Sequence, residues 1–141
     1  METIATAVWL SILGIIAYID MKELRIPNKL LLLLLLLYPL MLSNRSWVDS
    51  MIGGFMGGGV FLLAALLWPG KVGLGDVKMM AIIGLYMGKE TIMECIIVSL
   101  FLAALFGMTM LLRKKIDKTM GIPFAPFVFL ATIFHYVKVI G

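Results

Sequence analysis

Two aspartates lie at the ends of apolar segments in a chain dominated by hydrocarbon side chains. Asp20 closes the first apolar segment, and Asp76 ends the string Gly73-Leu74-Gly75-Asp76, where another apolar segment begins. An ionisable side chain within or beside a membrane span is costly unless it is paired or hydrated, so each aspartate marks a candidate functional site. Two carboxyl groups that share one proton can activate water and polarise a peptide carbonyl, which is the chemistry of aspartyl proteolysis. We therefore take Asp20 and Asp76 as a candidate catalytic pair.

The remaining acidic residues do not share this placement. Glu23 follows Asp20 in a loop where water solvates it, and Asp117 lies within a basic loop and offsets its neighbours. The other four lie near the opposite ends of the apolar segments: Glu2, Asp49, Glu90 and Glu94. Taken alone, Asp20 also fits an interfacial loop charge, and Asp76 also fits a helix N-cap after a glycine turn. The motifs around them favour the pair.

The composition is that of an integral membrane protein. The 141 residues are 62% hydrophobic and 14% charged, with a mean hydropathy of +1.09, whereas a soluble domain has about 25% charged residues. The length suits one domain, so we expect a single transmembrane domain over residues 1–141. The net charge of +4 does not indicate nucleic acid, because the basic residues cluster in short loops between apolar runs.

The hydropathy pattern predicts an all-α bundle of about six transmembrane helices. A spanning helix needs roughly 20 apolar residues, and the candidate segments are 4–19, 30–42, 51–68, 77–87, 91–112 and 123–140. The second and fourth segments are short and reach a sufficient length only by including flanking polar residues. The fourth would then begin near Gly73, which brings Asp76 to the edge of the membrane.

Basic residues divide unequally between the two sides of this topology. Nine fall on one side: Lys22, Arg25, Lys29, Lys71, Lys78, Arg113, Lys114, Lys115 and Lys118. Three fall on the other: Arg45, Lys89 and Lys138. Because basic loops stay cytoplasmic, we expect a multi-pass protein of the cell membrane with both termini outside and both aspartates facing the cytoplasm. The amino terminus has no basic region of the secretory kind, so we expect the first segment to be a retained span.

Several neighbours have residue types that would support such a site. Gly73 and Gly75 allow a close backbone approach, beside which a substrate strand can lie. Lys78 either neutralises charge near the site or anchors a helix at the headgroups. Asn28 is either a turn residue or a hydrogen-bond partner of the site, and Pro123 either starts a helix or shapes an irregular groove entrance.

Other conspicuous residues favour structural roles. Two overlapping pairs of glycines four residues apart run through residues 53–58 and favour tight helix packing within the bundle. A homodimer face and a flexible or thinned region are the alternatives. Cys95 fits a packing position, and His135 fits a helix-packing or interfacial role. One histidine, one cysteine and two distant acids do not form a metal site, and we see no cofactor motif, so no metal and no cofactor are expected.

Three motifs together resemble the type IV prepilin peptidases, membrane aspartyl proteases of the GxGD type. The matching pieces are Asp20 with Arg25-Ile26-Pro27-Asn28, then Gly73-Leu74-Gly75-Asp76-Val77-Lys78, then Pro123-Phe124-Ala125-Pro126-Phe127. They occur in the order of that family and extend over most of the chain. The third departs from the family, with Ala125 where many members have glycine, a change expected to affect the groove rather than catalysis.

The resemblance implies a function in pilus assembly or protein secretion. The chain would cleave the basic leader from prepilin-like membrane proteins at the cytoplasmic face, with Asp20 and Asp76 as the catalytic pair. Pilus or secretion assembly proteins are possible further partners. Many bacterial members also carry a cysteine-rich methyltransferase domain; this sequence resembles the short, peptidase-only form, and N-methylation is not expected.

Other functions fit the same residues less completely. A small transporter or channel subunit would use the two aspartates as a proton relay. A non-catalytic assembly protein would bind pilin precursors through the same groove. Presenilin-like proteases share the GxGD string, but the small size and the proline motif at 123–127 favour the prepilin peptidases.

Overall fold

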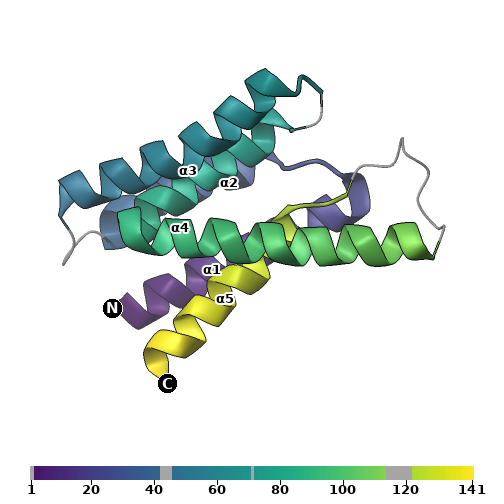
Figure 1. Cartoon of the computed structure of the whole chain (residues 1–141). Coiled ribbons are helices and arrows are strands. Elements are labelled where there is room, and N and C mark those ends of the chain that lie inside the picture. The colour runs from purple at the N-terminus through teal and green to yellow at the C-terminus, as the bar shows by residue number, and fades with distance from the viewer. Residues whose placement is uncertain (1, 42–45, 71, 114–121) are drawn as a thin grey trace.

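In this computed structural model, the described residues are 2–41, 46–70, 72–113 and 122–141, and their regular structure is entirely α-helical. Five helices follow one another (Figure 1): α1 (Glu2–Glu23), α2 (Asn28–Met41), α3 (Trp47–Leu67), α4 (Leu74–Leu112) and α5 (Ala125–Ile140). The predicted all-α class is therefore confirmed. Six residues used in the charge and topology arguments lie outside the described residues: Arg45, Lys71, Lys114, Lys115, Asp117 and Lys118.

Three of the described helices, α1, α3 and α4, are long and apolar enough to cross a membrane, while α2 and α5 are shorter apolar helices. Large apolar side chains cover much of the outside of the molecule, including Ile4, Phe55 and Leu112. Exposed apolar surface on this scale marks a membrane-facing protein. The count of six spans stays a prediction.

Helix α4 joins the fourth and fifth predicted segments and bends between them. Gly88 has φ 80 and ψ 174, a non-helical conformation that interrupts the helix. This left-handed φ is open to glycine because it has no Cβ. The first part of α4 runs beside α3, and the part after Gly88 takes a different direction (Figure 1). The interruption lies at the boundary that hydropathy predicted, between residues 87 and 91.

The glycines of α3 allow α3 and α4 to pack closely. Gly53, Gly54, Gly57 and Gly58 are all buried. A Cβ on Gly53 would collide with the backbone of Gly84 and Gly88 in α4, and the other three also face α4 residues. Packing within the molecule, the favoured interpretation, therefore accounts for this run.

Helix α2 packs against α1 and α4. Within its leucine run, Leu31 and Leu34 are buried in the core, whereas Leu32, Leu33 and Leu36 are exposed. Pro27 directly precedes the helix, and its carbonyl accepts the amide of Leu31 at 3.3 Å, as expected for proline at a helix start.

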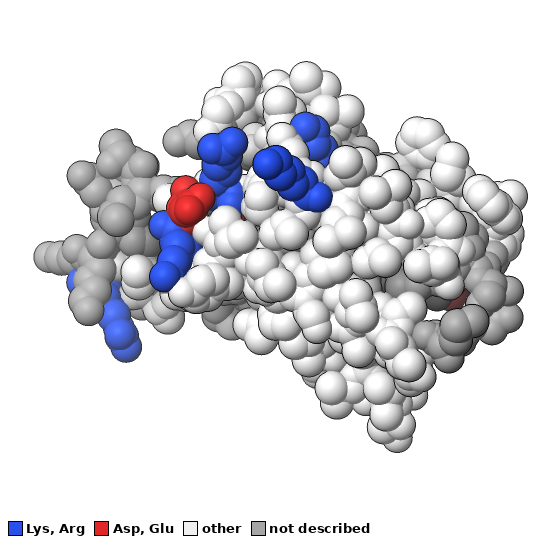
Figure 2. All heavy atoms as spheres, turned by 180° about the vertical axis from the view of Figure 1, so that it is seen from behind, with Lys and Arg blue, Asp and Glu red and all other residues white. Residues whose placement is uncertain are grey.

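The last turn of α1 meets the first residue of α5, and Trp9 in the first half of α1 packs against Tyr136 near the end of α5. These two helices therefore run in opposite directions. The two chain ends accordingly lie at the same end of the molecule (Figure 1). Seen from behind, the Lys and Arg side chains gather toward one end of the visible face, and most of that face is uncharged (Figure 2).

Candidate active site

A cavity of about 300 Å³ brings the end of α1, the connection to α2 and the start of α4 together. Its lining includes six of the seven predicted site residues: Asp20, Asn28, Gly73, Gly75, Asp76 and Lys78. Pro123, the seventh, is not among the described residues that line it. The cavity thus brings together Asp20 and Asp76, which are 56 positions apart in sequence and belong to two different helices.

Asp20 lies in the last turn of α1 and is only 5% exposed. Its Oδ2 accepts a hydrogen bond of 3.0 Å from the backbone amide of Ala125, the first residue of α5. The first backbone amides of a helix have no partner within the helix, and they favour a carboxylate at the helix N-terminus. Asp20 is thus a buried residue of a helix, and the alternative that it is an interfacial loop charge is wrong.

The chain leaves α1 through a left-handed residue. Leu24 has φ 52, and its amide donates to the carbonyl of Asp20 at 2.9 Å. A left-handed residue after the last helical turn is a common helix end, although glycine usually occupies it. This turn directs Arg25 and Ile26 to the wall of the cavity.

Asp76 lies in the first turn of α4 and is partly buried. The N-cap of α4 is Gly73, whose carbonyl accepts the Asp76 amide at 3.1 Å, and no side chain caps this helix. The alternative that Asp76 is the N-cap is therefore wrong. The carboxylates of Asp20 and Asp76 line one cavity and lie close enough for their charges to interact.

The two glycines of the motif differ in what they do. A Cβ on Gly75 would lie 3.1 Å from the Cβ of Ile26, tighter than ordinary contact, so Gly75 allows the start of α4 to approach the α1–α2 connection. Gly73 has φ −73 and ψ 144, an extended conformation open to any residue. A Cβ there would meet only Asp76 Oδ2, at 3.6 Å. The expected close approach is found at Gly75 but not at Gly73.

Three polar side chains surround the mouth of the cavity. Arg25, Asn28 and Lys78 are exposed and line it. Asn28 is the first residue of α2 and Lys78 lies in the second turn of α4, and both also line an apolar groove that continues between these helices. The cavity therefore has a cationic rim and opens onto an apolar surface.

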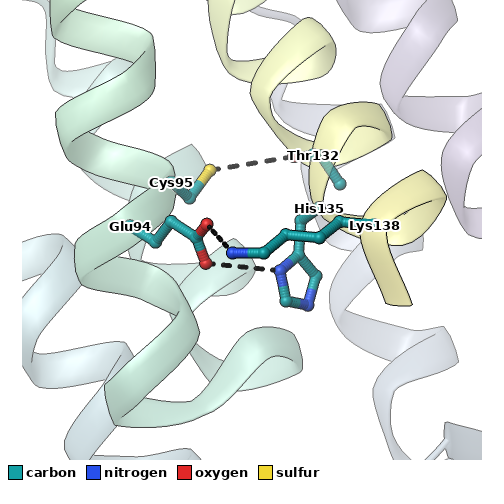
Figure 3. A network of polar contacts seen from close by, with 5 residues as sticks. All are labelled: Glu94, Cys95, Thr132, His135 and Lys138. Atoms are coloured by element: carbon teal, nitrogen blue, oxygen red, sulfur yellow. Dashed lines mark hydrogen bonds and ion pairs between the residues drawn. The ribbon is translucent and has the colours of Figure 1, made fainter. Parts of the chain in front are cut away.

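A second polar cluster joins α4 to α5 beyond the Gly88 bend (Figure 3). Lys138 Nζ lies 2.9 Å from Glu94 Oε1, and His135 Nδ1 lies 3.6 Å from Glu94 Oε2. Beside them, Cys95 Sγ is 3.8 Å from Thr132 Oγ1. His135 is ten residues beyond Ala125 on α5, which corresponds to roughly 15 Å along a helix. Cys95 is buried, as expected for a packing residue. His135 lies beside Glu94 of α4, away from the aspartates.

Two site features had no side-chain signal in the sequence. The Ala125 amide belongs to the main chain, and Ala125 itself was noticed only as a departure from a family motif. Ile26 was noticed within a motif, but its contact with Gly75 follows from the packing of two separate elements. Among the residues that the structure describes, no three His, Cys, Asp or Glu side chains form a group that could hold a metal ion.

Comparison with known protein families gives a match over most of the chain. The sequence model of the type IV leader peptidase family matches residues 7–110, a stretch that contains both aspartates. The chain therefore belongs to the type IV leader peptidase family. This membership and the apolar helices together make it an all-α membrane protein of a peptidase family.

Individual relatives extend the similarity over nearly the whole chain. The chain is 29% identical to the prepilin leader peptidase/N-methyltransferase of Bacillus subtilis, over 96% of its own length and 56% of that protein. It is 27% identical to the proteins of the same description from Aeromonas salmonicida and Aeromonas hydrophila, over 92% of this chain and 47% of each. The chain thus spans about half the length of these curated relatives. No solved structure gives a significant match.

Proposed function

We propose that this chain is a membrane aspartyl endopeptidase that removes the basic leader peptide from type IV pilin-like precursors. The observation that carries the proposal is the shared cavity, in which Asp20 of α1 and Asp76 of α4 face one space at the polar end of the helices. The similarity to prepilin leader peptidases supports the choice of substrate.

The proposed reaction is hydrolysis of one peptide bond by water. One carboxylate takes a proton from the attacking water, while the other, protonated, donates a hydrogen bond to the scissile carbonyl and polarises it. The water oxygen bonds to the carbonyl carbon, and the resulting tetrahedral species collapses as the C–N bond breaks and the leaving amine gains a proton. Neither step uses a metal or an organic cofactor.

The cationic rim fits a site at the membrane surface. Arg25 and Lys78 border the cavity, and Lys22 lies over the ring of Tyr18 at 4.8 Å in the same turn of α1 as Asp20. Basic residues favour the cytoplasmic side of a membrane protein. We therefore propose a multi-pass protein of the cytoplasmic membrane, with the cavity facing the cytoplasm, both termini outside, and one peptidase domain over residues 1–141.

The proposal is tested with purified protein in detergent and a tagged prepilin whose leader and mature portions can be separated by size. Wild type should release the leader, and Asp20→Asn and Asp76→Asn should each leave the precursor intact. Glu23→Gln is a matched control. Glu23 was expected in a loop, but it is the last residue of α1, an exposed acid in the same helical turn as Asp20, and it does not line the cavity. Cleavage that persists in either aspartate variant would overturn the proposal.

A further inference from the structure

The apolar groove between α2 and α4 continues from the aspartate cavity. It has a volume of about 580 Å³. The cavity and the groove share two lining residues, Asn28 and Lys78, at the point where they meet. A molecule bound across this point would have its polar portion beside the aspartates and its apolar portion along the helices.

The two walls of the groove have the same spacing. On α2 the lining residues are Asn28, Leu31, Leu32 and Leu35. This is the i, i+3, i+4, i+7 pattern of one face of a helix.

On α4 the lining residues are Lys78, Ala81, Ile82 and Leu85, which repeat the same pattern. Because each wall begins with a polar residue at the cavity and ends with leucine, the two helices run in the same direction along the groove. Parallel stripes of this kind form the walls in which a third helix packs.

The groove is already formed. Its floor is buried, with Leu31 at 3% and Ile82 at 8% exposure, whereas Leu32 on the rim is 57% exposed. At the far end, the Tyr86 hydroxyl donates to the Leu34 carbonyl at 2.5 Å and ties α4 to α2 beneath the groove. An incoming helix would therefore meet a prepared surface and would not have to separate α2 from α4.

We propose that this groove binds the apolar helix of the precursor, with the helix start at Asn28 and Lys78 and its axis along α2 and the first part of α4. The inference rests on the proposed function and adds the surface that recognises the substrate. The scissile bond then precedes the bound helix and lies at the aspartates, and the basic leader leaves through the polar mouth. In this arrangement, Leu32, Leu35 and Leu85 determine which apolar helices the groove accepts.

The test compares two substrates and two variants of α2. Leu35→Trp places a large ring in the groove, and Leu36→Trp is the matched control, because Leu36 is the adjacent exposed residue and does not line the groove. The substrates are the full tagged precursor and a short peptide with the leader and scissile bond but no apolar helix. We expect the ratio of kcat/KM for the precursor to that for the peptide to fall about tenfold in Leu35→Trp and to stay at the wild-type value in Leu36→Trp.

A crosslinking experiment makes the test independent of turnover. Cysteine replaces Leu35 or Leu36 in an Asp76→Asn, Cys95→Ala background, and the precursor carries one cysteine in its apolar helix. Disulfide formation from position 35 and not from position 36 is expected. Equal ratios in both tryptophan variants, or equal crosslinking from both positions, would overturn the groove assignment and leave the groove as a lipid-facing surface. Failure of wild type to cleave the precursor would instead count against the peptidase itself.

Discussion

The backbone amide of Ala125 donates a 3.0 Å hydrogen bond to Oδ2 of Asp20, 105 residues earlier in the chain. This bond joins the last turn of α1 to the first residue of α5 and fixes the rotamer of a buried acid. Ala125 is itself fully buried. The main chain of a distant helix thus helps to hold one of the two proposed catalytic groups.

This bond predicts different stabilities for two variants of Asp20. Asp20→Asn keeps a side-chain oxygen that accepts the Ala125 amide, so its thermal unfolding in detergent should resemble that of wild type. Asp20→Ala leaves the buried amide without its partner, which costs about 1–3 kcal/mol. Unfolding curves of the two variants measure the difference in their free energies of unfolding. Equal stability of the two would show that the bond contributes nothing to the fold.

The α3–α4 contact predicts opposite effects for two glycines of one helix. Gly53→Ala places a methyl group against the backbone of Gly84 and Gly88, and overpacking of this kind costs about 1–3 kcal/mol. Gly59→Ala, whose Cβ would meet nothing within 4 Å, should stabilise α3 by about 0.5–1 kcal/mol because glycine weakens a helix. Denaturant titration of both variants measures the difference, and a Gly53→Ala protein as stable as wild type would contradict the packing account.

The approach of Gly75 to Ile26 predicts a loss of activity that a second change repairs. Gly75→Ala pushes the start of α4 away from the α1–α2 connection and shifts Asp76 relative to Asp20. Small misplacements of reacting groups reduce rates strongly, and we expect kcat to fall about tenfold. The nearest atom to the new methyl group is the Cβ of Ile26. The double variant Gly75→Ala/Ile26→Gly should therefore have a higher kcat than Gly75→Ala, whereas Ile26→Gly alone should not have a higher kcat than wild type. No recovery in the double variant would argue against this contact.

The polar cluster of Glu94, His135 and Lys138 lies toward the other end of α5 from Asp20. We predict that this cluster does not contribute to catalysis. His135→Gln removes the imidazole near Glu94 but leaves the aspartate cavity untouched, so kcat and KM for the precursor should stay within about twofold of wild type, as for a surface change away from special features. Steady-state cleavage assays measure both constants. A loss comparable to that of an aspartate variant would place His135 in the catalytic machinery and contradict the assigned packing role.

The sequence predicted the helical segments and their approximate ends because long apolar runs and polar boundaries are local features. It also located the start of α4 near Gly73 and a boundary near Gly88. The choice between a bend and a loop at Gly88 was not predictable, since it depends on the φ of one residue. The short α2 and α5 likewise carry too few apolar residues for hydropathy alone to define their place in a membrane.

The site was predictable where it rests on rare residue types. Aspartates at the ends of apolar segments are conspicuous in an apolar chain, and six predicted residues line one cavity. The roles of Gly73 and Pro123 were less predictable, because Gly73 has an ordinary backbone conformation and Pro123 lies outside the cavity lining. The Ala125 amide had no side-chain signal at all, since backbone donors look alike in every sequence.

The most direct test of the account is the kinetics of precursor cleavage by Asp20→Asn, Asp76→Asn and the double variant, measured under single-turnover conditions. If the two carboxyl groups act as one unit, each single variant should lower the rate to the level of the double variant, because residues of one catalytic unit are strongly non-additive. Two results would refute the dyad by showing that Asp20 and Asp76 act independently. One is a single variant that keeps substantial activity. The other is a double variant whose loss of rate equals the product of the losses in the two single variants.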